Sequence, residues 1–223
     1  MFKVPKIPSD KTVAIVSDLH IGHDKEFLYG KRGFKNIREH DEWIFDELNA
    51  LSSQGNVVLM NLGDACLTRD QQANFDRLSR LPFDEHYFLW GNHNAGAKDA
   101  YNTGLSELGF LSGEQVYPWE YNSITFVGDS LSFRRAGLTF FCSHFAHFIW
   151  DRSHHGVIHL CGHSHGSCKD LNAPPSHIGK VLDCGVENAQ AHWGKPYFLL
   201  SGVIDIIEHK SIIQKDHHNA FTN

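Results

Sequence analysis

The sequence lacks any hydrophobic run of the roughly 18 residues that a membrane-spanning helix needs, so we expect no membrane partner. The N-terminal residues contain no long apolar stretch, and we therefore expect no secretory signal peptide. The five cysteines form no C-x-x-C pair, and their odd number argues against a disulfide framework. These absences predict a cytoplasmic protein with reduced thiols.

An excess of positive charge is also missing. The chain has 20 lysines and arginines against 26 acidic residues, for a net charge of −6. This balance argues against an extended nucleic-acid surface. A small phosphorylated substrate, such as a nucleotide, or a short oligonucleotide stays open as a partner, because bound metal ions would add local positive charge. The 223 residues contain no repeat, linker or low-complexity tract, which predicts a single domain over 1–223 and leaves the oligomeric state open.

Short apolar runs rich in β-branched and aromatic residues predict buried strands. These runs are 12–17, 56–61, 86–90, 138–142 and 157–161. Apolar residues at helical spacing predict helices over 37–51 and 70–81, and more weakly over 101–108. The stretch 124–136 and the run 138–142, separated by Gly137, predict a late hairpin. The pattern is typical of a mixed α/β fold with layered sheets.

Polar residues follow each of the five predicted strands. The strand ends lead into Asp18-Leu19-His20, Gly63-Asp64, Gly91-Asn92-His93, Ser143-His144 and Gly162-His163-Ser164-His165. One such motif alone is common in turns. Ligands of α/β sheets bind beyond the carboxyl ends of strands, so five such motifs in succession predict one shared site.

In this order, the motifs D-x-H, G-D, G-N-H, S-H and G-H-S-H resemble the signature of the calcineurin-like metallophosphoesterases. The start Asp18-Leu19-His20-Ile21-Gly22-His23, the segment Arg32-Gly33-Phe34 and the later Leu182–Glu187 segment are similar to a group of small bacterial and phage phosphoesterases. The resemblance implies an α/β fold of two mixed β-sheets packed face to face with flanking helices. It also implies phosphate-ester hydrolysis by a hydroxide bound to two metal ions.

Carried over by position, the resemblance implies two metal sites that share Asp64. One would use Asp18, His20, Asp64 and His165, and the other Asp64, Asn92, His144 and His163. Imidazole, carboxylate and amide donors favour Mn²⁺, with Fe, Zn, Ni or Co as alternatives. The resemblance assigns His93 the protonation of the leaving oxygen. Three further residues are predicted to contact the substrate phosphate: Asn92, His23 and Arg32.

The sequence departs from relatives in two places. Asn94 follows His93 where many relatives have an acidic residue, so either His93 is a weaker acid–base group or another carboxylate is its partner. Leu67 and Thr68 replace the acidic and basic residues of the G-D-x-x-D-R-G motif of protein serine/threonine phosphatases, which argues against protein phosphatase activity.

We therefore expect a phosphodiesterase that acts on a nucleotide or short nucleic acid. A phosphomonoesterase, a nucleotide pyrophosphatase and a non-catalytic metal-binding scaffold are the alternatives. Three aromatic residues after His144 are candidates for stacking on a base, although aromatic residues beside a strand end more often belong to the core: Phe145, Phe148 and Trp150. Six histidines without counterparts in the family pattern are predicted to lie at the surface: His154, His155, His177, His192, His217 and His218.

Overall fold

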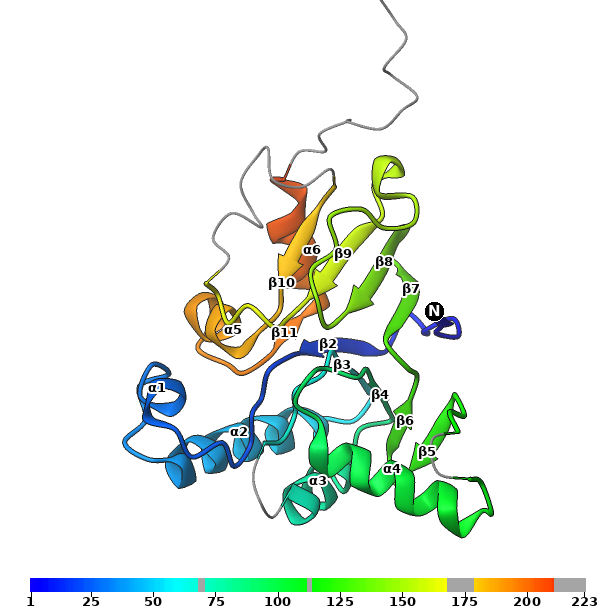
Figure 1. Cartoon of the computed structure of the whole chain (residues 1–223). Coiled ribbons are helices and arrows are strands. Elements are labelled where there is room, and N and C mark those ends of the chain that lie inside the picture. The colour runs from blue at the N-terminus through cyan, green and yellow to red at the C-terminus, as the bar shows by residue number, and fades with distance from the viewer. Residues whose placement is uncertain (68–70, 112–113, 168–178, 211–223) are drawn as a thin grey trace, which may run out of the picture.

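The computed structural model describes residues 1–67, 71–111, 114–167 and 179–210, and it contains two mixed β-sheets with helices beside them (Figure 1). The strands are β1 (Phe2–Lys3), β2 (Thr12–Val16), β3 (Val57–Asn61), β4 (Glu85–Phe88), β5 (Trp119–Tyr121), β6 (Ile124–Phe126), β7 (Ser130–Arg135), β8 (Leu138–Ser143), β9 (Ile158–Cys161), β10 (Val181–Asp183) and β11 (Phe198–Leu199). The helices are α1 (Glu26–Tyr29), α2 (Ile37–Ser52), α3 (Gln71–Ser79), α4 (Ala95–Glu107), the 3₁₀ turn η1 (Ser153–His155), α5 (Val186–Trp193) and α6 (Leu200–Glu208). The predicted mixed α/β class is confirmed.

The six-stranded sheet has the order β11-β2-β3-β4-β6-β5. Strands β2, β3, β4 and β6 are parallel, and the antiparallel strands β11 and β5 form its two edges. All five residues of β3 are buried, as are four of the five in β2. Continuous apolar strands are typical of a parallel sheet that is covered on both faces.

The five-stranded sheet has the order β1-β7-β8-β9-β10. Its β7–β8 hairpin turns at Ala136 and Gly137, whose φ angles are 50° and 77°, as a two-residue type I′ turn requires. The prediction that 124–136 forms one arm of this hairpin is wrong in part. Residues 124–126 form β6 in the other sheet, and the chain changes sheet at Gly128, where a φ of 86° favours glycine.

Two large cores hold these layers together. One lies between the sheets, because it contains Ile15 and Val58 of the six-stranded sheet with Phe133, Phe140 and Leu160 of the five-stranded sheet. The other core packs α2, α3 and α4 against the opposite face of the six-stranded sheet (Figure 1). The two sheets therefore pack face to face, with helices on the outside.

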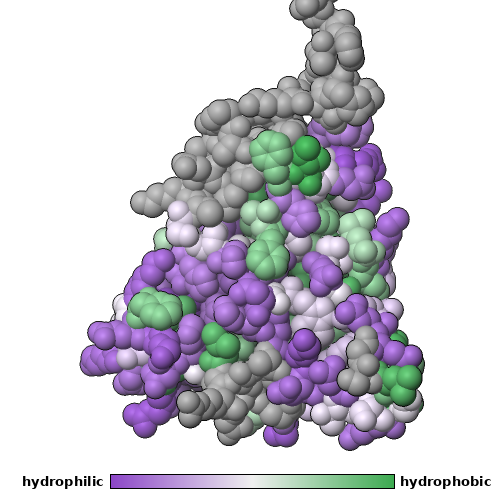
Figure 2. All heavy atoms as spheres, in the orientation of Figure 1, coloured by the Kyte–Doolittle hydropathy of each residue, from purple (hydrophilic) through white to green (hydrophobic). Residues whose placement is uncertain are grey.

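Most predicted elements are confirmed within two residues at each end. Helix α4 is the main exception, since it begins at Ala95, six residues before the predicted start at Tyr101. Position 70, the predicted start of the second helix, lies outside the described residues. No helix in the described ranges is both long and apolar enough to cross a membrane. The face of the molecule in Figure 2 is mainly hydrophilic, with hydrophobic side chains in small separate patches.

Candidate metal centre

The strand ends bring the predicted ligands into two groups of side chains. Asp18 and His20 follow β2, Asp64 follows β3, His144 follows β8, and the 163–165 segment follows β9. Asp18, His20 and His165 form one group, and Asp64, His144 and His163 form the other. Within each group the three donor atoms lie within 4.8 Å of one another. Side chains from both sheets thus meet at the carboxyl ends of their strands.

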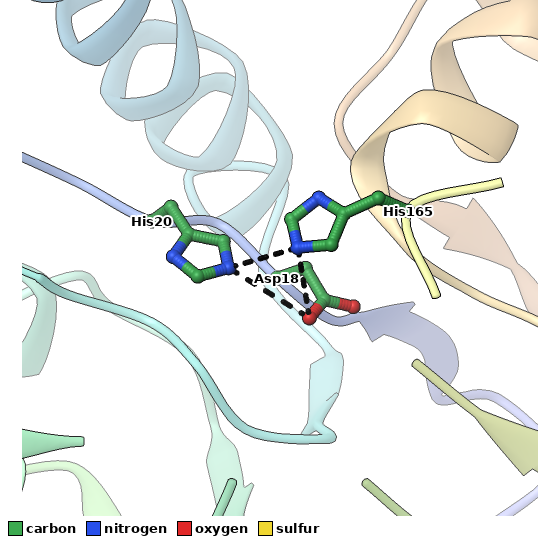
Figure 3. A group of neighbouring side chains, drawn as sticks. All are labelled: Asp18, His20 and His165. Atoms are coloured by element: carbon green, nitrogen blue, oxygen red, sulfur yellow. Dashed lines mark hydrogen bonds and ion pairs between the residues drawn. The ribbon is translucent and has the colours of Figure 1, made fainter. Parts of the chain in front are cut away.

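The first group is drawn in Figure 3. The Nε2 atoms of His20 and His165 lie 3.1 Å apart, and they are 3.9 and 3.8 Å from Asp18 Oδ1. This carboxylate oxygen is buried and has no hydrogen-bond partner among the described residues. A buried carboxylate oxygen without a partner is costly, and a cation between these three atoms would remove that cost. The donors therefore fit a divalent metal ion.

The second group has a similar form. His144 Nε2 lies 3.3 Å from Asp64 Oδ2 and 3.0 Å from Asn92 Oδ1. The other ring nitrogen of His144, Nδ1, lies 2.9 Å from the backbone oxygen of Leu62, which fixes the ring. Asn92 is thus placed with this group, as predicted. Imidazole, carboxylate and amide oxygen together suit Mn²⁺, Fe or Zn²⁺.

Asp64 lies between the two groups. Its Oδ2 atom is 3.3 Å from His144 Nε2 and 3.8 Å from His20 Nε2. Its other oxygen, Oδ1, accepts a 2.7 Å hydrogen bond from the backbone N–H of His93. One carboxylate therefore faces histidines of both groups, which is the geometry of a bridging ligand.

Five of the predicted ligands have left-handed backbone conformations. The φ angles of Asp18, His20, Asp64, His163 and His165 lie between 49° and 69°. Such conformations cost roughly 1–3 kcal/mol each for residues other than glycine, and they concentrate at functional sites. Hydrogen bonds between the loops hold them, including His20 N–H to the Asp64 carbonyl at 2.9 Å and His163 N–H to Asp18 Oδ2 at 2.9 Å.

Two glycines of the motifs permit close approach at the site. A Cβ atom at Gly91 would lie 2.1 Å from Asp64 Oδ1, and one at Gly162 would lie 2.5 Å from Asp18 Oδ2. Any larger residue at either position would displace a carboxylate. The carboxylates of Asp64 and Asp18 therefore explain why G-N-H and G-H-S-H have glycine at these two positions.

The pKa values reflect a buried, negatively charged site. Burial raises the pKa of Asp18 to about 6, and burial together with the charge of His165 lowers the pKa of His20 to about 2. Burial alone would raise the pKa of Asp64, but the hydrogen bond and charge of His144 outweigh it and the pKa is lowered. The pKa of His144 is raised, because its hydrogen bond to Asp64 and the two carboxylate charges outweigh its burial. The carboxylates thus stabilise positive charge at this position.

Arg32 is a correction to the sequence prediction. Its side chain is fully buried, so it does not reach a substrate phosphate. The guanidinium donates to Glu187 Oε1 at 3.0 Å and to the backbone oxygens of Leu19 and Asp18 at 3.0 and 2.7 Å. Arg32 therefore fixes the backbone of the D-x-H segment from behind.

Glu187 is a site residue that the sequence reasoning missed. Its Oε1 atom accepts hydrogen bonds from both Arg32 Nε and His165 Nδ1, the latter at 2.9 Å. The Leu182–Glu187 segment was noted for its resemblance, but nothing in its spacing relates Glu187 to a histidine 22 residues earlier. Only the pairing of β10 with β9 brings α5 beside the His163–His165 loop.

The predicted catalytic histidine is placed at the rim of the centre. His93 is exposed, and its ring centroid lies 5.8 Å from that of His20. His23 is half-buried with its ring 5.4 Å from His20, so it faces the same opening. Asn94 is buried, and its side-chain oxygen accepts from the Asp64 backbone N–H at 3.0 Å. Asn94 thus supports the Asp64 loop.

The three aromatic candidates differ in position. Phe145 is exposed, and its ring lies 5.0 Å from His144 and 4.7 Å from His163. Phe148 is also exposed. Trp150 is buried and its Nε1 donates to the Val157 carbonyl, so it is a core residue and not available for base stacking.

The histidines predicted to lie at the surface divide into two sets. His155 and His192 are exposed, and His154 is half-buried. Positions 177, 217 and 218 lie outside the described residues, so the prediction for His177, His217 and His218 stays a prediction.

Comparisons with known proteins give a likeness in fold. No family model and no curated protein matches the chain. Among solved structures, the protein of unknown function AQ665 from Aquifex aeolicus matches with a TM-score of 0.50 and 15% sequence identity. The match covers 88% of this chain and 100% of that chain. At this identity the likeness concerns the fold alone, which is a mixed, layered α/β fold.

Proposed function

We propose that this protein is a dinuclear metallophosphoesterase with a calcineurin-like fold that hydrolyses a phosphate ester. The observation that carries the proposal is the position of Asp64 Oδ2, 3.3 Å from one histidine group and 3.8 Å from the other. A carboxylate between two groups of histidines can bind an ion on each side, whereas a structural histidine cluster has no use for one there. Asp18, His20 and His165 would hold one ion, Asn92, His144 and His163 the other, and Asp64 would bridge them. Mn²⁺ is the preferred ion, with Fe, Zn, Ni or Co as alternatives.

Different residues of the chain would have different roles in such a hydrolysis. When bound, two divalent ions supply Lewis acidity, which activates a water and neutralises charge on the phosphate. The exposed imidazole of His93 lies at the rim, where it can give a proton to the leaving oxygen. The half-buried ring of His23 is placed to contact a phosphate oxygen. The deep burial of Asp18 and Asp64 keeps their carboxylates in place.

We favour a phosphodiester of a nucleotide or a short nucleic acid as substrate. The test begins with chelator-treated protein, to which Mn²⁺, Fe²⁺, Zn²⁺, Ni²⁺ or Co²⁺ is added singly. Metal content is measured, and turnover is followed with bis(p-nitrophenyl) phosphate and p-nitrophenyl phosphate. We expect two equivalents of metal and faster hydrolysis of the diester. Faster hydrolysis of the monoester would favour a phosphomonoesterase.

Asp64→Asn is the sharpest variant for this test. It should abolish turnover and lower the content of both metals, because its carboxylate contacts both groups. Asp46→Asn, on the exposed side of α2, is the matched control and should behave as wild type. If the wild type binds two metals but hydrolyses no ester, the alternative of a non-catalytic metal-binding scaffold is favoured. Normal metal content and rate in Asp64→Asn would refute the bridge.

A further inference from the structure

A cavity of about 510 Å³ opens beside His93. Asn92 and His93 form the part of its wall that faces the metal centre. Most of the rest comes from α4, from the segment that leads into β5 and from Trp90 after β4, and Leu67 and Asp129 complete the lining. Ligand pockets for small molecules measure roughly 300–1,000 Å³, so the cavity is large enough for a nucleoside. Because the cavity lies beside His93, a part of the substrate that binds in it would be joined to the phosphate on the side of His93.

Three aromatic residues line one side of this cavity: Trp90 and Tyr117, which are half-buried, and Tyr101, which is buried. The rings of Tyr101 and Tyr117 are stacked, with centroids 5.6 Å apart and planes 16° apart. Trp90 Nε1 donates to the Tyr117 hydroxyl, and the Tyr101 hydroxyl donates to the Val116 carbonyl. The hydroxyls are thus bonded within the protein and the rings are fixed. A rigid aromatic wall favours a flat ring system as ligand, because stacking then costs little conformational entropy.

The polar residues of the cavity select against a bare phosphate. Lys98 is opposed by two acidic residues, Glu114 and Asp129, so the cavity has no excess of positive charge. Asn102 and Gln115 are exposed, and their amides have no hydrogen-bond partner among the described residues. An amide offers one acceptor and two donors, which complement the mixed edge of a nucleobase.

We propose that this cavity binds the nucleobase of the substrate, so that a nucleoside is the leaving group. The proposal rests on the proposed function for the position of the phosphate. With the base against the Trp90–Tyr101–Tyr117 wall, the nucleoside oxygen lies on the side of His93, the residue placed to protonate it. The substrate class is therefore a nucleotide or dinucleoside phosphate that releases a nucleoside.

The test measures binding of adenosine and of uridine to the full chain by titration calorimetry, which does not depend on turnover. The double variant Asn102→Leu/Gln115→Leu removes both amides and should weaken binding about tenfold, the cost of losing contacts to a base edge. Thr103→Leu is the matched control, since Thr103 is exposed on the same helix and does not line the cavity. Tyr117→Leu removes one ring of the wall and should weaken binding of both nucleosides.

Activity separates this proposal from the proposed function. In the double variant, kcat/KM for a dinucleoside phosphate should fall about tenfold relative to kcat/KM for bis(p-nitrophenyl) phosphate, which has no nucleobase. If the wild type hydrolyses neither ester but its nucleoside binding is lost in the double variant, the base site stands and the enzyme proposal fails. If no nucleoside binds the wild type, or all variants bind alike, the base site is refuted whatever the activity.

Discussion

His165 owes its orientation to Glu187 as well as to its own loop. Glu187 Oε1 accepts from His165 Nδ1, which leaves Nε2 as the nitrogen that faces Asp18 and His20. Burial would raise the pKa of Glu187, but the hydrogen bond of His165 and the charge of Arg32 hold it well below its ordinary value. The carboxylate is therefore ionised at neutral pH and fixes the tautomer of His165, a proposed metal ligand, from behind.

Glu187→Gln should weaken metal binding at the His165 group. The amide keeps the size of the side chain but loses the charge that pairs with Arg32 and supports His165. Loss of such a supporting partner typically lowers metal affinity about 10- to 100-fold. Competition with a metal-binding dye measures this. Glu47→Gln, which breaks the distant ion pair with Lys195, is the control and should leave metal affinity unchanged.

His93→Ala should reduce activity in a way that depends on the leaving group. The neighbouring Asn92, and not His93, supplies a predicted ligand, so metal content should be that of the wild type. General acid catalysis contributes about 10²- to 10⁴-fold, and an ester that releases nitrophenolate needs little of it. We therefore expect a small loss with bis(p-nitrophenyl) phosphate and a large loss with a dinucleoside phosphate. Equal losses on both esters would assign His93 to phosphate binding.

At this scale the sequence predicts which side chains meet at the site better than it predicts the side chains that surround them. The resemblance implied Asp64 and His163 as ligands, and the structure brings both into one group because each lies in a loop after a strand whose end is fixed. The same reasoning misplaced Arg32 and omitted Glu187, because both depend on which side chains become buried together. The position of a strand and of the loop after it can be predicted from the local pattern of residues, whereas side-chain contacts between distant segments cannot.

Among the elements, β4 contains an unusual buried group. His86 is fully buried between β3 and β6, and neither ring nitrogen has a hydrogen-bond partner in the described part of the chain. The rings of Phe83 and Phe88 lie 5.7 and 6.4 Å away. Burial lowers the pKa of His86 from its ordinary 6.5 to about 3. The folded protein therefore holds this imidazole neutral.

His86→Leu should make the protein less sensitive to acid. Between about pH 6.5 and 3 the unfolded chain binds a proton at His86 and the folded chain does not, so stability falls as the pH falls through this window. At pH 5 this proton binding lowers the free energy of unfolding of the wild type by about 2 kcal/mol relative to pH 8. The difference in unfolding free energy between His86→Leu and wild type should shift by about that amount between pH 8 and 5.

Urea unfolding of metal-free protein at the two pH values measures this shift. His192→Leu is the control, since His192 is exposed and its replacement should not change the pH dependence. An unchanged difference between His86→Leu and wild type at pH 8 and 5 would mean that His86 accepts a proton in the folded state.

Elements were predicted well where the apolar pattern was continuous. Strands β2 and β3 are buried on both faces, and their apolar runs match the predicted ranges closely. The prediction failed at 124–136, where the pattern of a strand continues across Gly128 although the chain changes sheet. The choice of sheet depends on the pairing of β6 with β4, in which His86 pairs with Ile124, 38 residues later in the chain.

For the whole molecule, the two sheets are joined by a link at the end of β2 opposite the metal centre. Arg135 of β7 donates to the backbone oxygens of Ile7, Ser9 and Lys11 at 3.2, 2.8 and 2.7 Å, and also to that of Pro8. Residues 7–11 lead into β2. Arg135 thus connects the hairpin of one sheet to the segment that enters the other. No pattern in the sequence predicts this link, because it joins positions more than 120 residues apart.

Arg135→Lys should destabilise the molecule without changing its metal centre. A lysine ammonium cannot reproduce the fork of a guanidinium that reaches several carbonyls, so these exposed or partly buried acceptors would lose a partner in the protein. We expect a loss of about 0.5–1.5 kcal/mol in the free energy of unfolding, measured in urea. Metal content should be unchanged, since the five residues of β2 separate this segment from Asp18 by about 16 Å.

Arg134→Lys is the matched control, because Arg134 is the exposed neighbour on the same strand and should change stability little. Equal stability of the two variants would show that the sheets do not depend on this link, and a loss of metal in Arg135→Lys would show that the packing of the sheets controls the centre.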